Sequence, residues 1–189
     1  MSTGAARLLG GLAGGFTLAR GRASGLALID RTAEGAWASF AAMWVCLPPY
    51  LLLRLLTGGP VGEVSLRLVA AEGIGYVLGW FALPMLMLGV TEGMGRRGRF
   101  PGFVAAWNWA KPPQLAAMLA AALVAATGLA PGAAADAVAL AALLYALWVS
   151  WFAARASLGI GGAQAAFVVG ADVLVGLFVT GVTLTLGRG

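Results

Sequence analysis

The sequence predicts an all-α integral membrane protein, a bundle of five transmembrane helices with an N-terminal interfacial segment. Of its 189 residues, 61% are hydrophobic and 10% are charged, and the mean hydropathy is +0.91. A soluble domain carries about 25% charged residues, so this chain lacks the polar surface that would keep it in water. Helical spans would use nearly all of residues 31–189, which leaves room for one membrane domain after the segment 1–30.

Five stretches of the chain have about the 20 mostly apolar residues that a membrane-crossing helix needs. The stretches are 36–56, 73–91, 102–127, 137–154 and 163–186. Asp30 or Thr32 can cap the first helix, because short polar side chains accept hydrogen bonds from the free amides of a first turn. The second helix can begin as early as Glu63. The loops between the spans are short, so they leave no room for a soluble domain.

Prolines and glycines add two expectations about these spans. A proline inside a helix removes a backbone donor and frees a carbonyl, so the mid-span prolines are expected to break their helices. The prolines concerned are Pro48, Pro49, Pro84, Pro112 and Pro113. In the second span, the pairs Gly75 and Gly79, and Gly89 and Gly93, have the spacing that lets helices approach closely.

The segment 1–30 contains an apolar run that glycines interrupt, with Arg7 before it and Arg20 and Arg22 after it. A cleaved signal peptide has an apolar core of similar length. The glycines and the arginines that follow at once favour the other interpretation, a retained segment lying on the cytoplasmic face of the membrane.

The arginines predict the orientation, because cytoplasmic loops carry an excess of Lys and Arg. With the N-terminus inside, five spans place eight basic residues inside and three outside. The inner set is Arg7, Arg20, Arg22, Arg31, Arg96, Arg97, Arg99 and Arg155, and the outer set is Arg54, Arg67 and Arg188. Abundant Arg, Ala and Gly are typical of a GC-rich genome. We therefore expect a multi-pass protein of a bacterial inner (plasma) membrane, with its N-terminus cytoplasmic and its C-terminus periplasmic.

Composition also limits the chemistry. Histidine is absent and Cys46 is the only cysteine, which excludes disulfides within the chain, Cys/His zinc sites and Ser–His or Cys–His catalysis. We expect no cofactor, no metal site and no enzymatic activity. The sequence pI of about 10.4 is explained by loops facing an anionic leaflet, so the expected partner is the lipid bilayer and not nucleic acid.

The most informative residues are polar side chains inside the third and fifth spans: Asn108, Lys111, Gln114 and Asp172. A lysine at a helix centre costs about 3 kcal/mol on insertion scales and usually finds a partner inside the bundle. Lys111 and Asp172 each lie nine residues into their spans, roughly 13 Å deep at 1.5 Å per residue. This equal depth predicts an ion pair within hydrogen-bonding reach, either direct or through a water. The alternative is that Lys111 extends to the cytoplasmic headgroups while Asp172 is protonated.

Three segments resemble a group of uncharacterised small membrane proteins from alphaproteobacteria: 30–40 (DRTAEGAWASF), 81–84 (FALP) and 105–110 (AAWNWA). More distantly, five spans with a cytoplasmic N-terminus are similar to the YIP-domain membrane proteins, whose eukaryotic members act in vesicle trafficking. Neither resemblance implies a site residue for this chain.

Two functions follow as hypotheses. The first is a non-enzymatic membrane protein that scaffolds or associates with other membrane components. The alternative is a subunit of a small transporter or channel, with a polar path near Lys111 and Asp172. Because five short spans enclose little volume, transport would require a homo-oligomer. A water-filled cavity reaching Lys111 would favour transport, and a dry, tightly packed centre would favour the scaffold.

Overall fold

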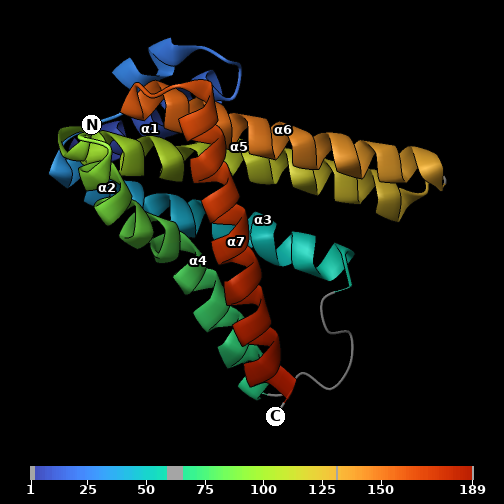
Figure 1. Cartoon of the computed structure of the whole chain (residues 1–189). Helices are drawn as coiled ribbons and strands as arrows, with labels where there is room; N and C mark the ends of the chain where they lie inside the picture. The colour runs from blue at the N-terminus through green and yellow to red at the C-terminus, as the bar shows by residue number, and fades with distance from the viewer. Residues whose placement is uncertain (1–2, 59–65, 131, 189) are drawn as a thin grey trace.

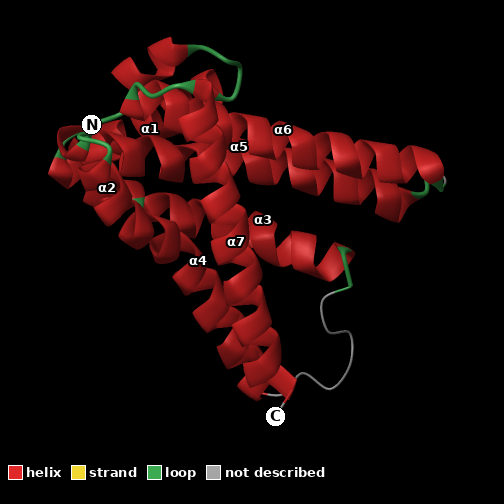
Figure 2. Ribbon diagram, viewed as in Figure 1, coloured by secondary structure: helices red, strands yellow, loops and turns green. Residues whose placement is uncertain are grey.

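The computed structural model describes residues 3–58, 66–130 and 132–188 (Figure 1). The regular structure of these residues is entirely helical, which confirms the predicted all-α class (Figure 2). The elements are α1 (Thr3–Leu18), η1 (Ala23–Ala27), α2 (Ala33–Ser39), α3 (Ala41–Leu56), α4 (Leu66–Gly93), η2 (Arg97–Arg99), α5 (Phe100–Thr127), α6 (Ala133–Leu158) and α7 (Gly162–Arg188).

Four helical segments in the described residues are long and apolar enough to cross a membrane. They are Ala33–Leu56, which combines α2 and α3, and then Leu66–Gly93, Ala133–Leu158 and Gly162–Gly187. This is a multi-pass membrane protein by length and composition. The helix predicted as the third span, α5, has 28 residues but is not among the four. Its central part contains Asn108, Lys111 and Gln114, which lower its apolar content.

The start of the first span is capped as the sequence predicts. The Thr32 hydroxyl accepts a hydrogen bond from the Gly35 amide at 3.0 Å, so Thr32 is the N-cap of α2. The Asp30 carboxylate does not cap the helix but accepts hydrogen bonds from the Thr32 amide and hydroxyl. The predicted early start of the second span, near Glu63, lies outside the described residues.

The expectation that the prolines break their helices is wrong. Helices α3, α4 and α5 each run without interruption through their prolines. A helix packed in a bundle can tolerate the lost hydrogen bond, because neighbouring groups and small local adjustments satisfy the freed carbonyl. The first span is interrupted instead at Phe40, between α2 and α3.

The helices form two arms that meet at one end and diverge towards the other (Figure 1). One arm is the antiparallel pair α5 and α6, and the second is the antiparallel pair α4 and α7. We call the end where they meet, with the α4–α5 and α6–α7 connections, the closed end, and the opposite end the open end. At the closed end the Arg99 guanidinium donates to the Leu158 carbonyl at 3.1 Å, and the Trp151 indole donates to the Gly162 carbonyl at 2.9 Å. The arginine-rich connections of the sequence therefore lie together.

The N-terminal helix α1 packs along the first half of α5. Glycines make this approach possible: a Cβ on Gly15 would lie 1.9 Å from the Trp109 carbonyl oxygen, and one on Gly11 would lie 2.1 Å from the Trp109 ring. With 16 residues, α1 is about 24 Å long, which is too short to cross about 30 Å of hydrocarbon. The interfacial position of segment 1–30 stays a prediction. The packing of this segment on α5 was not predicted from the sequence.

Candidate functional site: a cavity between the helix arms

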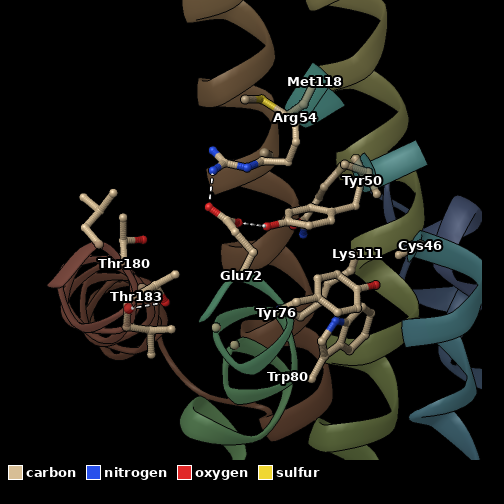
Figure 3. Close-up of a pocket in the computed structure, with 18 residues that line it drawn as sticks. Cys46, Tyr50, Arg54, Glu72, Tyr76, Trp80, Lys111, Met118, Thr180 and Thr183 are labelled. Atoms are coloured by element: carbon tan, nitrogen blue, oxygen red, sulfur yellow. Dashed lines mark hydrogen bonds and ion pairs between the residues drawn. The ribbon is translucent and has the colours of Figure 1, made fainter. Parts of the chain in front are cut away.

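A cavity of about 590 Å³ lies between the two arms and is open on one side (Figure 3). Helices α3, α4, α5 and α7 supply most of its wall, and α6 adds one residue. The lining residues are Cys46, Tyr50, Arg54, Glu72, Gly75, Tyr76, Gly79, Trp80, Lys111, Gln114, Leu115, Met118, Ala146, Gly176, Val179, Thr180, Thr183 and Leu184. Its size is within the roughly 300–1,000 Å³ of small-molecule sites.

Lys111 reaches this cavity from the middle of α5. Its ammonium lies over the Trp80 ring of α4, 5.0 Å from the ring centroid, and its side chain is half-buried. An ammonium is attracted to the negative face of an indole, and desolvation strengthens that attraction. The aromatic ring thus holds the charge at the inner part of the cavity without neutralising it.

The direct ion pair predicted between Lys111 and Asp172 is absent, although both residues lie in the described part of the chain. Asp172 of α7 does not line the cavity, and its electrostatic partner is nevertheless Lys111. The two charges interact across a distance too long for a hydrogen bond. Equal depth in the sequence did not produce contact, because α7 packs mainly on α4 and α6 and not on α5.

The other two predicted site residues point to different places. Gln114 lines the cavity and donates from Nε2 to the Ser150 hydroxyl of α6 at 3.1 Å. Asn108 is completely buried away from the cavity and donates from Nδ2 to the Ser39 hydroxyl at 2.9 Å. A step of six residues turns a helix by about 600°, so the two side chains of α5 point about 120° apart. The polar residues of this helix therefore do not form one continuous path.

The Ser39 hydroxyl donates to the Ala36 carbonyl at 2.6 Å, so it can only accept from Asn108. This leaves the Oδ1 atom of Asn108 as the one buried side-chain polar atom without a partner among the described residues. The Asn108–Ser39 contact joins α5 to the end of α2, beside the interruption at Phe40. Its position indicates a role in packing the closed end.

Sequence reasoning missed an ion pair near the outer part of the cavity. Arg54 of α3 pairs with Glu72 of α4, and the Tyr50 hydroxyl donates to the same carboxylate at 3.3 Å (Figure 3). The Tyr50 ring also packs on the Tyr76 ring, with centroids 4.6 Å apart. A signal was present in the sequence: Arg54 lies near the end of one predicted span and Glu72 near the start of the next, so a hairpin brings them to similar depth.

The wall formed by α7 depends on Gly75. A Cβ at Gly75 would lie 2.3 Å from the Thr183 hydroxyl oxygen, so the glycine allows close packing of α4 on α7 there, as its spacing predicts. The partner position Gly79 has no atom within 4 Å of a built Cβ and faces the cavity. A Cβ built at Gly89 or at Gly93 would likewise have no atom within 4 Å. Only one glycine of the two predicted pairs serves helix packing.

Among the described residues, no group of three or more Cys, Asp or Glu side chains could hold a metal ion. Cys46 is a free, buried thiol at the edge of the cavity. The groups that the cavity offers for binding are the Lys111 ammonium and the Gln114 amide, because the hydroxyls of Tyr50 and Tyr76 donate to Glu72 and to the Met43 carbonyl.

No family model, no curated protein and no solved structure matches this chain. The resemblances to the alphaproteobacterial group and to the YIP-domain proteins stay predictions.

Proposed function

We propose that this protein is a small membrane transporter, or a subunit of one, that holds its solute in the cavity beside Lys111. The observation that carries the proposal is the cavity of about 590 Å³ that reaches an ammonium in the middle of α5. The scaffold hypothesis predicts a dry and tightly packed centre. In this molecule the space between the arms beside Lys111 is a cavity, so the geometry favours the alternative hypothesis of transport.

In this proposal α5 also crosses the membrane, which together with the four segments above makes five spans. A helix of 28 residues is about 42 Å long, which exceeds the roughly 30 Å of a hydrocarbon core. Such a helix fits the bilayer when it is tilted. Because the two arms diverge, both can cross the bilayer if they tilt away from its normal in opposite directions. Lys111 then lies near the middle of the membrane, where its neighbours Trp80 and Gln114 replace part of its hydration.

The positive-inside rule places the closed end, with Arg96, Arg97 and Arg99, in the cytoplasm of a bacterial cell. The cavity then opens towards the periplasm while the packed closed end blocks its path to the inside. This is the arrangement of an outward-open state in an alternating-access cycle. The chain has few helices with which to enclose a permeation path, so we propose that it works as a homo-oligomer or with a second subunit.

Water access to the cavity tests this function. In a Cys46→Ala background, Thr180→Cys places a thiol on the cavity wall. Phe178→Cys places one on the other side of α7, because two residues turn a helix by about 200°. Phe178 does not line the cavity and 72% of its surface is exposed, so it faces lipid. An impermeant, negatively charged methanethiosulfonate is then added from either side of the membrane.

We expect rapid modification of Thr180→Cys from the periplasmic side and little from the cytoplasmic side, with Phe178→Cys unreactive from both. Equal inertness of the two thiols would indicate a dry centre and return the scaffold hypothesis to first place. Reaction only from the cytoplasmic side would contradict the orientation. A periplasm-active reporter fused at Gly98 provides a second test of orientation and should be silent.

A further inference from the structure

We propose that the ligand of the cavity is an amphiphilic anion: a single negatively charged head bound at Lys111, carrying one apolar chain that lies between α5 and α7. This inference rests on the proposed binding function and adds the chemical class of the ligand. It follows from the charges that line the cavity, from the character of its outer wall and from its open side.

The charge balance of the cavity selects an anion. In the part of the chain that the structure describes, the charged residues that line the cavity are Arg54, Glu72 and Lys111. Arg54 and Glu72 neutralise each other in an ion pair that Tyr50 completes. Lys111 has no acidic partner within 4.0 Å, and Asp172, which interacts with it from a longer distance, does not line the cavity. A compact ammonium in a partly desolvated site binds a carboxylate or phosphate oxygen through strong, charge-assisted hydrogen bonds.

Polar groups that would orient a head lie close to this cation. Gln114 is one helical turn from Lys111 on α5 and lines the same cavity, and its amide nitrogen has a second N–H besides the one that it donates to Ser150. Trp80 covers one side of the ammonium, which directs its remaining donors towards the open volume. The tyrosine hydroxyls are engaged elsewhere: Tyr50 donates to Glu72, and Tyr76 donates to the Met43 carbonyl at 2.6 Å. The site therefore has room for one small charged head and not for several.

Apolar side chains from three helices line part of the cavity, alongside the Arg54–Glu72 pair and the hydroxyls of Thr180 and Thr183. Leu115 and Met118 line it from α5, Ala146 from α6, and Val179 and Leu184 from α7. A fully hydrophilic anion would leave these walls facing water, whereas an alkyl chain covers them. Met side chains adapt to flexible apolar ligands more easily than branched ones do.

The mouth of the cavity, which opens towards the periplasm, lies between the diverging arms and therefore also borders the bilayer. Helix α7 packs chiefly on α4 and α6, and the arm of α5 and α6 diverges from it towards the open end (Figure 1). These helices also carry exposed large apolar side chains, including Leu143 on α6 and Leu177 on α7, which are 45% and 65% exposed. An amphiphile dissolved in the leaflet can slide its chain between the arms while its head moves to Lys111.

The test is equilibrium binding to the full-length protein in phosphatidylcholine nanodiscs, with radiolabelled laurate as the probe. Dodecanol, which has the chain without the charge, and acetate, which has the charge without the chain, are the competitors. We expect saturable laurate binding, with dodecanol and acetate each weaker by at least about tenfold. Dodecyl phosphate should compete as well as laurate. Discs containing phosphatidylglycerol test a two-chain anionic lipid as the source of the anion, and displacement of laurate by this lipid would contradict a single-chain ligand.

Lys111→Met should weaken laurate binding by about tenfold or more, and Lys111→Arg should restore most of it. The matched control is Arg155→Met, because Arg155 also lies over a tryptophan, Trp151 at 5.2 Å, but outside the cavity. That variant should bind laurate normally. Melting curves in detergent verify that all variants are folded.

Two outcomes separate this inference from the proposed function. If acetate competes as well as laurate, or dodecanol binds as tightly and independently of Lys111, the amphiphilic anion is wrong. The water-accessible cavity, measured by reaction of Thr180→Cys, would still stand. If that thiol is inert and no probe binds, both proposals fail.

Discussion

At the closed end Phe103 and Leu158 are completely buried, whereas on α7, beyond its packed start, Leu177 and Phe178 expose 65% and 72% of their surface. The two regions are equally apolar. In a bilayer, lipid tails are as apolar as leucine, so hydrophobicity alone does not bring helices together. The difference comes from additional packing partners, because α1 and α2 both pack on α5, with close contacts at Trp109 and Asn108.

This comparison explains where the cavity forms. Small residues allow close approach at the closed end, where Ala105, Ala106 and Ala154 have no exposed surface. Further along α5, Lys111 and Gln114 are too polar to be packed tightly against apolar neighbours, and the arms separate at that level. A rigid base and a divergent opening suit a protein that must bind and release a ligand without unfolding.

The largest expected effect comes from removing a side chain of the closed end. Phe103→Ala deletes a completely buried ring that packs on Trp107, with centroids 5.4 Å apart, and should cost about 3 kcal/mol of unfolding free energy. Phe178→Ala, which removes the same side chain from an exposed position, should cost less than about 0.5 kcal/mol. Unfolding in mixed micelles with increasing dodecyl sulfate measures both. Equal losses would mean that the two ends are packed alike.

The close approach of α1 to α5 should be the next most sensitive feature. Gly15→Ala places a methyl group against the Trp109 carbonyl, which belongs to the backbone and cannot move aside. We expect a loss of about 1–3 kcal/mol, typical of overpacking. Gly73→Ala is the matched control, because its Cβ meets no atom within 4 Å. If Gly15→Ala melts like the control, α1 does not belong to the closed end.

Removing the cap of α2 should have a smaller effect. Thr32→Ala deletes the hydroxyl that accepts from the Gly35 amide, and such caps contribute about 1 kcal/mol. Thr32→Ser keeps the acceptor and should retain most of the stability. Thermal unfolding in detergent, followed by circular dichroism, distinguishes the three proteins. No difference between Ala and wild type would show that α2 is held by its packing on α5 alone.

The smallest expected effect is the loss of stability at low pH through protonation of Asp30. Hydrogen bonds from the Thr32 hydroxyl and amide, with a further contribution from Arg7 at 3.3 Å, hold the pKa of Asp30 below its ordinary value of 3.8. A lowered pKa in the folded state adds stability above that ordinary value, and the stability is lost as the pH falls through the folded pKa.

Melting temperatures of the wild type should therefore fall between about pH 4 and about pH 2 more steeply than those of Asp30→Asn. The variant cannot titrate at this position, so its remaining slope reports the other carboxylates. Parallel slopes would mean that the Asp30 carboxylate contributes nothing to the folded state. Asp30 and Arg7 connect α1 to the start of α2, so this pH dependence measures one contact of the closed end.

Local features were predictable from the sequence because they depend on neighbours along the chain. The all-helical class follows from long apolar runs, the cap at Thr32 from a polar residue before such a run, and the closeness at Gly75 from small size. That Arg99 and Arg155 lie towards the same end followed from counting spans. Each of these depends on composition, spacing or depth, which the linear order of residues contains.

The site was decided by tertiary structure, because depth does not determine which side of a helix faces which neighbour. Lys111 and Asp172 were expected to pair from equal depth, but α7 packs against α4 and α6, so the lysine lies over Trp80 instead. The continuous passage of α5 through Pro112 and Pro113 likewise depends on the bundle around it. Helix rotation and the divergence of the arms are properties of the packed whole, set by which small and large side chains meet across it.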